Sequence, residues 1–232
     1  MRIALLGTSP SSRHLAPFDD PSWIIWGTGP GNLNSAGKLK RCDAFFEIHP
    51  WDDIAKEESY APYCMALREV PKVYTQKPEI MLPNSVAYPL DEMVEKYGPY
   101  FFTSSFSYMM AMAIRDLLAS PDKEKIMGFW GVDMSATEEY AAQRPGCHYF
   151  ITMAQQRGIK VTIPPESDLL RPQPMYGLSE TSPMAIKLLA RKREIDARLA
   201  SVQATYENAV REQMFLKGAL DDLNYIINTW VD

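Results

Sequence analysis

Three short segments carry the small and hydroxyl side chains that suit a phosphate site. Gly7-Thr8-Ser9-Pro10-Ser11 follows an apolar run at residues 3–6, and the glycine-rich residues 27–32 follow a second apolar run. Thr103-Ser104-Ser105 precedes a longer apolar segment. At turns that lead from a strand into a helix, backbone N–H groups, hydroxyls and the positive end of the helix dipole bind phosphates. The candidate binding residues are Gly7, Thr8, Ser9, Ser11, Gly27, Asn32, Thr103, Ser104 and Ser105.

Each of these segments also has a plain structural role. None matches a dinucleotide-binding or Walker motif. The first two are equally strand-to-helix turns, and the third is equally the N-cap of a buried helix. Asn32 either contacts a base or ribose edge or shapes its turn. A ligand site is favoured only if the fold brings the segments together.

A few side chains near these segments could carry out acid–base chemistry. His49 lies beside Glu47 at the end of a predicted strand, and His148 lies in a segment that also holds Arg144. Histidine titrates near neutral pH, which suits a general base. Asp133, after another predicted strand, suits a ribose hydroxyl, a divalent metal or proton transfer. We therefore take His49, Asp133 and His148 as candidate catalytic residues and Arg144 as a phosphate ligand. The alternatives are a helix cap, an ion pair or a surface side chain.

The elements that must position these residues alternate between strand and helix. Apolar runs predict strands at residues 3–6, 22–26, 42–48, 125–132 and 158–163, and a weaker one at 71–74. Helices are expected at 89–97, 106–115 and 138–157, with Pro145 and Gly146 breaking or kinking the last. This alternation predicts an α/β, Rossmann-like fold with a mostly parallel sheet and flanking helices. Such folds bind ligands at the carboxyl edge of the sheet.

The chain changes character at Ser182, after which neither glycine nor proline occurs between Pro183 and Gly218. Apolar residues recur there in steps of four and three, the spacing of packed helices. We interpret these residues as two apolar series that are out of phase with each other. This pattern predicts a helical hairpin or one long helix with a shifted apolar face. We expect a nucleotide-binding domain at 1–178 and a helical extension at 182–232 that forms a homo-oligomer. The two series are Ile195, Leu199, Val202 and Tyr206, then Leu216, Leu220, Leu223, Ile227 and Trp230.

Composition excludes several classes of protein. The 232 residues are 46% hydrophobic and 23% charged, which is typical of globular domains. No apolar run approaches the ~18 residues that span a membrane, and the first residues do not form a signal peptide. The net charge of −5 gives no general attraction to nucleic acid. The three cysteines have neither CxxC nor zinc spacing, so we expect reduced thiols, no metal centre and a cytoplasmic location.

Two motifs resemble a known family. Ile3-Ala-Leu-Leu-Gly-Thr-Ser-Pro-Ser11 resembles the opening turn of bacterial CMP-sialic-acid sialyltransferases and MptE-like proteins. The helix beginning at Thr103-Ser104-Ser105 and the later Gly131-Val132-Asp133 resemble their second motif, with Ser105 in place of a glycine. Residues 16–26, 46–49 and 139–145 are also similar to phage-encoded proteins. The resemblance covers residues 1–178.

The resemblance implies a nucleotide bound between the first turn and the Thr103 helix. It implies a transferase, foremost a phage glycosyltransferase that uses a nucleotide-sugar, with a modified DNA base as a possible acceptor in the host cytoplasm. One alternative is an MptE-like pyrophosphokinase that uses a nucleoside triphosphate and a divalent metal. Another is a phage protein that binds a nucleotide without catalysis. The donor, the acceptor and the metal requirement are left open.

Overall fold

The computed structural model describes residues 1–34, 38–56, 60–134, 138–170 and 183–230. Contacts within the chain divide it into two compact units, Met1–Leu170 and Arg171–Asp232. The boundary expected between residues 178 and 182 lies outside the described residues and stays a prediction. Among the described residues, none of the helices combines the length and apolarity that crossing a bilayer requires.

The first unit is built on a seven-stranded sheet in the order β5-β4-β3-β2-β1-β6-β7. All neighbouring strands pair in parallel, as the alternating pattern predicted. The fold is therefore α/β and Rossmann-like. The six predicted strands are present, and one further short strand, β5, is added at the edge. The strands are β1 (Arg2–Leu6), β2 (Trp23–Thr28), β3 (Ala44–Phe46), β4 (Val73–Thr75), β5 (Ser85–Ala87), β6 (Ile126–Trp130) and β7 (Lys160–Thr162).

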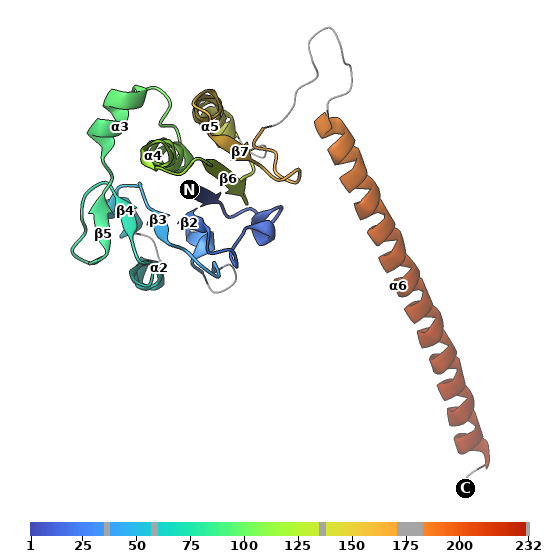
Figure 1. Cartoon of the computed structure of the whole chain (residues 1–232). Helices are drawn as coiled ribbons and strands as arrows, with labels where there is room; N and C mark the ends of the chain where they lie inside the picture. The colour runs from blue at the N-terminus through green and yellow to red at the C-terminus, as the bar shows by residue number, and fades with distance from the viewer. Residues whose placement is uncertain (35–37, 57–59, 135–137, 171–182, 231–232) are drawn as a thin grey trace. The chain divides into compact units, whose positions relative to one another are not determined.

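Helices cover both faces of this sheet (Figure 1). Residues of β1 alternate between the two faces: Ile3 and Leu5 pack with α3, α4 and α5, whereas Ala4 and Leu6 pack toward the η1 side. Helix α2 covers Phe45 and Val73 on the second face. A strand buried on both faces explains the uninterrupted apolar run at residues 3–6. The helices are η1 (Arg13–Leu15), η2 (Pro30–Asn32), α1 (Trp51–Ile54), α2 (Tyr60–Arg68), α3 (Leu90–Tyr97), α4 (Ser105–Ala119) and α5 (Glu138–Gln156).

Two expectations about the helices are decided by the structure. Helix α5 runs through Pro145 and Gly146, so the expected break is wrong. The second unit contains one helix, α6 (Pro183–Trp230), and this selects the long helix over the hairpin.

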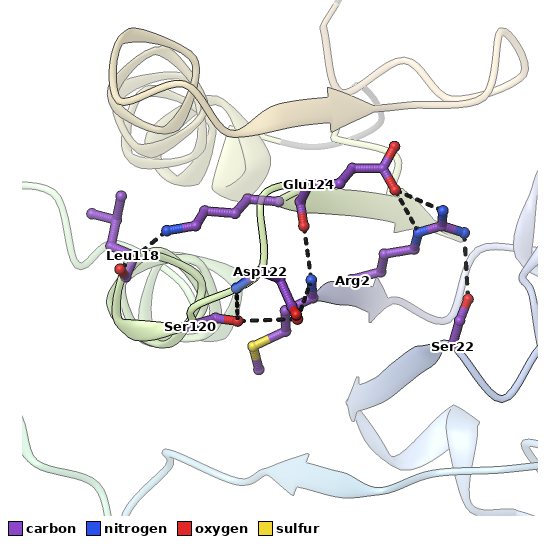
Figure 2. A network of polar contacts seen from close by, with 8 residues as sticks. Arg2, Ser22, Leu118, Ser120, Asp122 and Glu124 are labelled. Carbon is purple, nitrogen blue, oxygen red and sulfur yellow. Dashed lines mark hydrogen bonds and ion pairs between the residues drawn. The ribbon is translucent and has the colours of Figure 1, made fainter.

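The central strand β1 is held at both of its ends. At its amino end the terminal ammonium contacts the Glu124 carbonyl at 2.7 Å and the Asp122 carboxylate at 2.6 Å. Arg2 donates two hydrogen bonds to the Glu124 carboxylate and one to Ser22 (Figure 2). These bonds draw the starts of β1, β2 and β6 together, on the edge opposite the predicted site.

At its carboxyl end β1 passes very close to the end of β6. The Gly7 amide donates to the Trp130 carbonyl and the Ser9 amide to the Gly131 carbonyl, both at 2.9 Å. A Cβ on residue 7 would lie 2.2 Å from the Gly131 oxygen, well inside van der Waals contact. Glycine at this position is therefore explained by backbone packing.

We predict that Gly7→Ala lowers the free energy of unfolding by about 1–3 kcal/mol, because the added methyl group overpacks a rigid backbone contact. Guanidinium unfolding followed by tryptophan fluorescence measures the effect. Gly218→Ala is the control, since a Cβ there meets nothing within 4 Å. Equal midpoints for the two variants would contradict this account.

Candidate functional site

A cavity of ≈ 430 Å³ opens at the carboxyl edge of the sheet, within the size range of small-ligand sites. Its walls come from the segments that follow β1, β2 and β3 and from the start of α4. Three of the predicted segments therefore meet in one place. The lining residues are Gly7, Thr8, Thr28, Gly29, Ile48, His49, Phe102, Thr103, Ser104, Ser105, Phe106, Tyr108 and Gln143.

The start of α4 forms one wall of this cavity. Ser104 has an extended backbone and caps the helix, its Oγ accepting the Ser107 amide at 3.4 Å, as the sequence predicted. The Thr103 hydroxyl donates to the Gln143 carbonyl at 2.9 Å. These two hydroxyls therefore serve the protein. The remaining first-turn amides have no carbonyl inside the helix to accept them, and with the helix dipole they favour an anion beside Ser105.

The turn at residues 7–11 is bonded mainly to the protein itself. Gly7 and Thr8 line the cavity, but the Gly7 and Ser9 amides are used by the end of β6. The Ser9 hydroxyl donates to the Asp133 carboxylate at 2.6 Å and lies 3.2 Å from the Ser11 hydroxyl. The Asp168 amide donates to the same carboxylate at 3.1 Å. Ser9, Ser11 and Asp133 thus tie the two loops together and lie outside the cavity lining.

Gly27 and Asn32 are also occupied by structural contacts. A Cβ at Gly27 would meet the Leu39 and Phe45 side chains, so this glycine serves packing. Asn32 is fully buried, and its amide donates to the Leu6 and Thr28 carbonyls at 3.2 and 2.8 Å. Its oxygen accepts the Arg13 guanidinium at 3.2 Å. The Asn32 side chain is therefore bonded to the ends of β1 and β2 through its nitrogen and to η1 through its oxygen.

The His49 imidazole and the Glu47 carboxylate are hydrogen-bonded to each other at the end of β3. Glu47 is 3% exposed, and its carboxylate lies 2.5 Å from His49 Nδ1. The same carboxylate accepts the His49 amide at 3.2 Å and the Tyr63 hydroxyl at 2.5 Å. Burial and the neighbouring carboxylate both raise the pKa of Tyr63, so the phenol keeps its proton and donates it.

This arrangement decides which nitrogen of His49 carries a proton. The His49 amide and the Tyr63 hydroxyl both donate to Glu47, so its carboxylate acts as an acceptor here and the proton is assigned to Nδ1. In that tautomer Nε2 carries the lone pair, which is the requirement for a general base. The sequence predicted His49 and placed Glu47 beside it without a role for that carboxylate, and Tyr63 was missed. The available signal was a glutamate in an otherwise apolar strand, two residues before a histidine.

His49 also borders a second, largely apolar cavity of ≈ 340 Å³. The Tyr63 ring reaches this cavity from α2, so the buried pair and the cavity share a wall. The lining residues are Pro30, His49, Pro50, Asp53, Ile54, Tyr60 and Tyr63.

His148 and Arg144 lie on α5 and do not line the cavity. His148 Nε2 contacts the Leu169 carbonyl at 2.9 Å, and the Arg144 guanidinium donates to the Met134 carbonyl. Burial raises the pKa of the Cys42 and Cys147 thiols to about 12, so both are protonated at neutral pH. Among the described residues, no three His, Cys, Asp or Glu side chains converge as a metal-ligand set.

No protein-family model matches this sequence, and a search of curated proteins also finds no match. Solved structures of the sialyltransferase CstII from Campylobacter jejuni resemble it in fold. The complex with the substrate analogue CMP-3FNeuAc is 13% identical over 70% of this chain and 79% of its own, with a TM-score of 0.43. The complex with cytidine-5'-monophosphate is 13% identical over 82% of this chain and 98% of its own, with a TM-score of 0.42. Likeness at this level carries no argument about the activity or the ligands of this chain.

We predict that Asn32→Ala lowers the free energy of unfolding by about 1–3 kcal/mol, because it leaves buried carbonyls without their donor. Thermal or guanidinium unfolding provides the measurement. Thr8→Ala is the control, since Thr8 is exposed and its loss is expected to change stability by less than about 0.5 kcal/mol. If Asn32 serves mainly to bind a ligand, the two variants will be equally stable.

Proposed function

We propose that this chain is a glycosyltransferase that takes a sugar from a nucleotide-sugar and uses His49 as the general base. The observation that carries the proposal is the Glu47–His49 pair beside a cavity that ends at the start of α4. The donor class comes from the sequence resemblance at residues 3–11 and 103–133.

The donor phosphate is placed at the amino end of α4. A 15-residue helix begins there, and its dipole and first-turn amides favour an anion next to Ser105. The aromatic rings of Phe102, Phe106 and Tyr108 line the same cavity and provide apolar surface for a base or a sugar. Gly7 and Thr8 close the cavity on the side of β1.

The acceptor enters from the second cavity, on the Tyr60 and Tyr63 side of His49. Nε2 of His49 takes the proton of the acceptor hydroxyl, and Glu47 stabilises the resulting imidazolium. The acceptor oxygen forms a bond to the anomeric carbon while the bond from that carbon to the phosphate oxygen breaks. The nucleotide leaves with that electron pair. The aromatic and proline lining suits a neutral acceptor with an apolar ring face.

A DNA base as acceptor requires positive charge to hold the phosphate backbone. Three of the basic residues that could hold this backbone are engaged with acidic neighbours. Lys38 pairs with Glu69, Arg41 with Asp43 at 3.4 Å, and Arg191 with Glu194 at 2.6 Å. A small or oligosaccharide acceptor is therefore the better fit. Transfer to DNA that weakens steeply with salt would favour the DNA version instead.

The donor site is tested by Ser105→Asp, with Ser105→Asn as the matched neutral control. The carboxylate repels a phosphate, so we expect the Kd for a nucleotide-sugar to rise by about tenfold or more. The same carboxylate favours the helix dipole, so stability is expected to hold or to rise by about 0.3–1 kcal/mol. Calorimetric titration and thermal unfolding measure the two effects.

Loss of binding without loss of stability separates a ligand site from a structural one. Unchanged nucleotide binding in Ser105→Asp would refute the donor placement. If no nucleotide or nucleotide-sugar raises the Tm of the wild type, the whole proposal fails, since a ligand at 100 times its Kd adds about 2.7 kcal/mol.

The base is tested by His49→Gln and Glu47→Gln. Each is expected to lower kcat by about 10²–10⁴-fold, because one removes the base and the other removes the carboxylate that fixes its tautomer. Donor binding should stay within about threefold of the wild type, since neither side chain is placed against the phosphate. Single-turnover transfer and calorimetry give the two quantities.

Tyr63→Phe is the comparison variant, because it removes one donor to Glu47 and keeps the ring. Its effect on kcat should be smaller than that of Glu47→Gln. Full activity in Glu47→Gln would remove the basis for His49 as base. Activity on a nucleoside triphosphate that EDTA abolishes would identify a pyrophosphokinase, and tight nucleotide binding without turnover a sequestering protein.

A further inference from the structure

Helix α6 presents a continuous row of apolar side chains to solvent. Large apolar residues along it, from Leu188 to Trp230, are 43–79% exposed. Rows of this kind mark interaction surfaces, because isolated apolar residues are common on proteins but long contiguous ones are not. A 48-residue helix also needs packing for most of its stability.

The row follows one heptad register over its whole length. The treatment of the two apolar series as out of phase is wrong, because Ala209 and Gln213 connect Tyr206 to Leu216 in steps of three, four and three. We call this set the α6 seam. Its a positions are Lys192, Leu199, Tyr206, Gln213, Leu220 and Ile227, and its d positions are Leu188, Ile195, Val202, Ala209, Leu216, Leu223 and Trp230.

We propose that the α6 seam binds the seam of a second copy of this chain, in a parallel and in-register coiled coil. A strict repeat of 3.5 residues over six heptads is the pattern that keeps one seam facing an identical helix. The heptad pattern of the α6 seam therefore favours the same seam of a second copy as its partner.

Charges beside the seam are compatible with a parallel pair. In a parallel, in-register pair, each g residue faces the e residue five positions later on the other helix. This brings Arg191 against Asp196 and Glu212 against Lys217 of the second copy. Both pairs are attractive.

An antiparallel pair that overlaps from Leu188 to Ile227 also has attractions, because e faces e there and Asp196 meets Lys217 of the other copy. The charges are therefore compatible with both orientations. The polar residues of the seam distinguish them, because this antiparallel overlap sets Gln213 against Val202.

The polar members of the seam agree with an in-register pairing. Gln213 opposite its own copy forms a side-chain hydrogen bond in a layer where a shifted register would leave it buried without a partner. Lys192, near the start of the helix, already contacts Asp196 at 2.8 Å within its own chain. That ion pair reduces the repulsion between two lysines in one layer.

The test compares Leu223→Glu with Tyr225→Glu in the full chain, by light scattering at micromolar concentration. Leu223 is a seam residue and Tyr225 lies on the outer face, yet they are 55% and 66% exposed on the single helix. We expect the wild type and Tyr225→Glu to be oligomers and Leu223→Glu to dissociate, with a Kd raised about 100-fold or more. A monomeric wild type, or equal behaviour of the two variants, would overturn the proposal.

Orientation is tested with Ile195→Cys and Leu223→Cys, made separately. A parallel, in-register pair brings each new cysteine opposite its copy, so both variants should form an interchain disulfide under mild oxidation. An antiparallel pair can align at most one of these positions with itself. Crosslinking of one variant alone, or of neither, would therefore overturn the parallel arrangement. The wild type, with Cys42, Cys64 and Cys147, is the background control.

Discussion

The change of direction of the chain at β1 is the constraint on which the first unit depends. From β1 the strands proceed to β2, β3, β4 and β5 on one side, and the chain then returns through α3 and α4 to β6 on the other. Connections that leave one edge in opposite directions open a crevice between them. The amino end of α4 and the loops after β1, β2 and β3 border that crevice, and the ≈ 430 Å³ cavity lies there. The tight contact between Gly7 and the end of β6 holds the loop after β1, where Gly7 lines the cavity.

Beside this crevice, the buried Glu47 carboxylate determines how the His49 imidazole is held. A charge in that position is tolerated only with hydrogen-bond donors around it, and Tyr63 and two groups of His49 provide them. The requirement to satisfy the carboxylate is what holds the imidazole in one orientation and one tautomer. The same hydrogen bonds thus satisfy the buried carboxylate and hold the imidazole where it lines the cavity.

The second unit follows a different principle. The first unit buries its apolar residues by packing helices on a sheet, whereas α6 keeps its seam exposed along its described length. An apolar row on a single helix has no interior of its own. Its burial therefore depends on another surface, and the unbroken heptad register makes an identical helix the natural partner.

Local patterns were sufficient to predict much of this protein. The strands at 3–6 and 125–132, the Ser104 cap, the apolar α4 and the long C-terminal helix follow from periodicity, capping chemistry and glycine placement, which act over a few residues. Edge strand β5 was missed because three residues with partly exposed side chains carry little periodicity.

What individual polar residues do was decided only by the tertiary structure. Asp133 and Ser9, 124 positions apart, bind each other, and Asn32 turns to the ends of β1 and β2. His49, by contrast, gains a buried carboxylate and borders the ≈ 430 Å³ cavity. Hydroxyls, amides and carboxylates at strand ends suit a ligand and a neighbouring backbone equally well. Which of the two they meet depends on strand order, a long-range property that no local pattern contains.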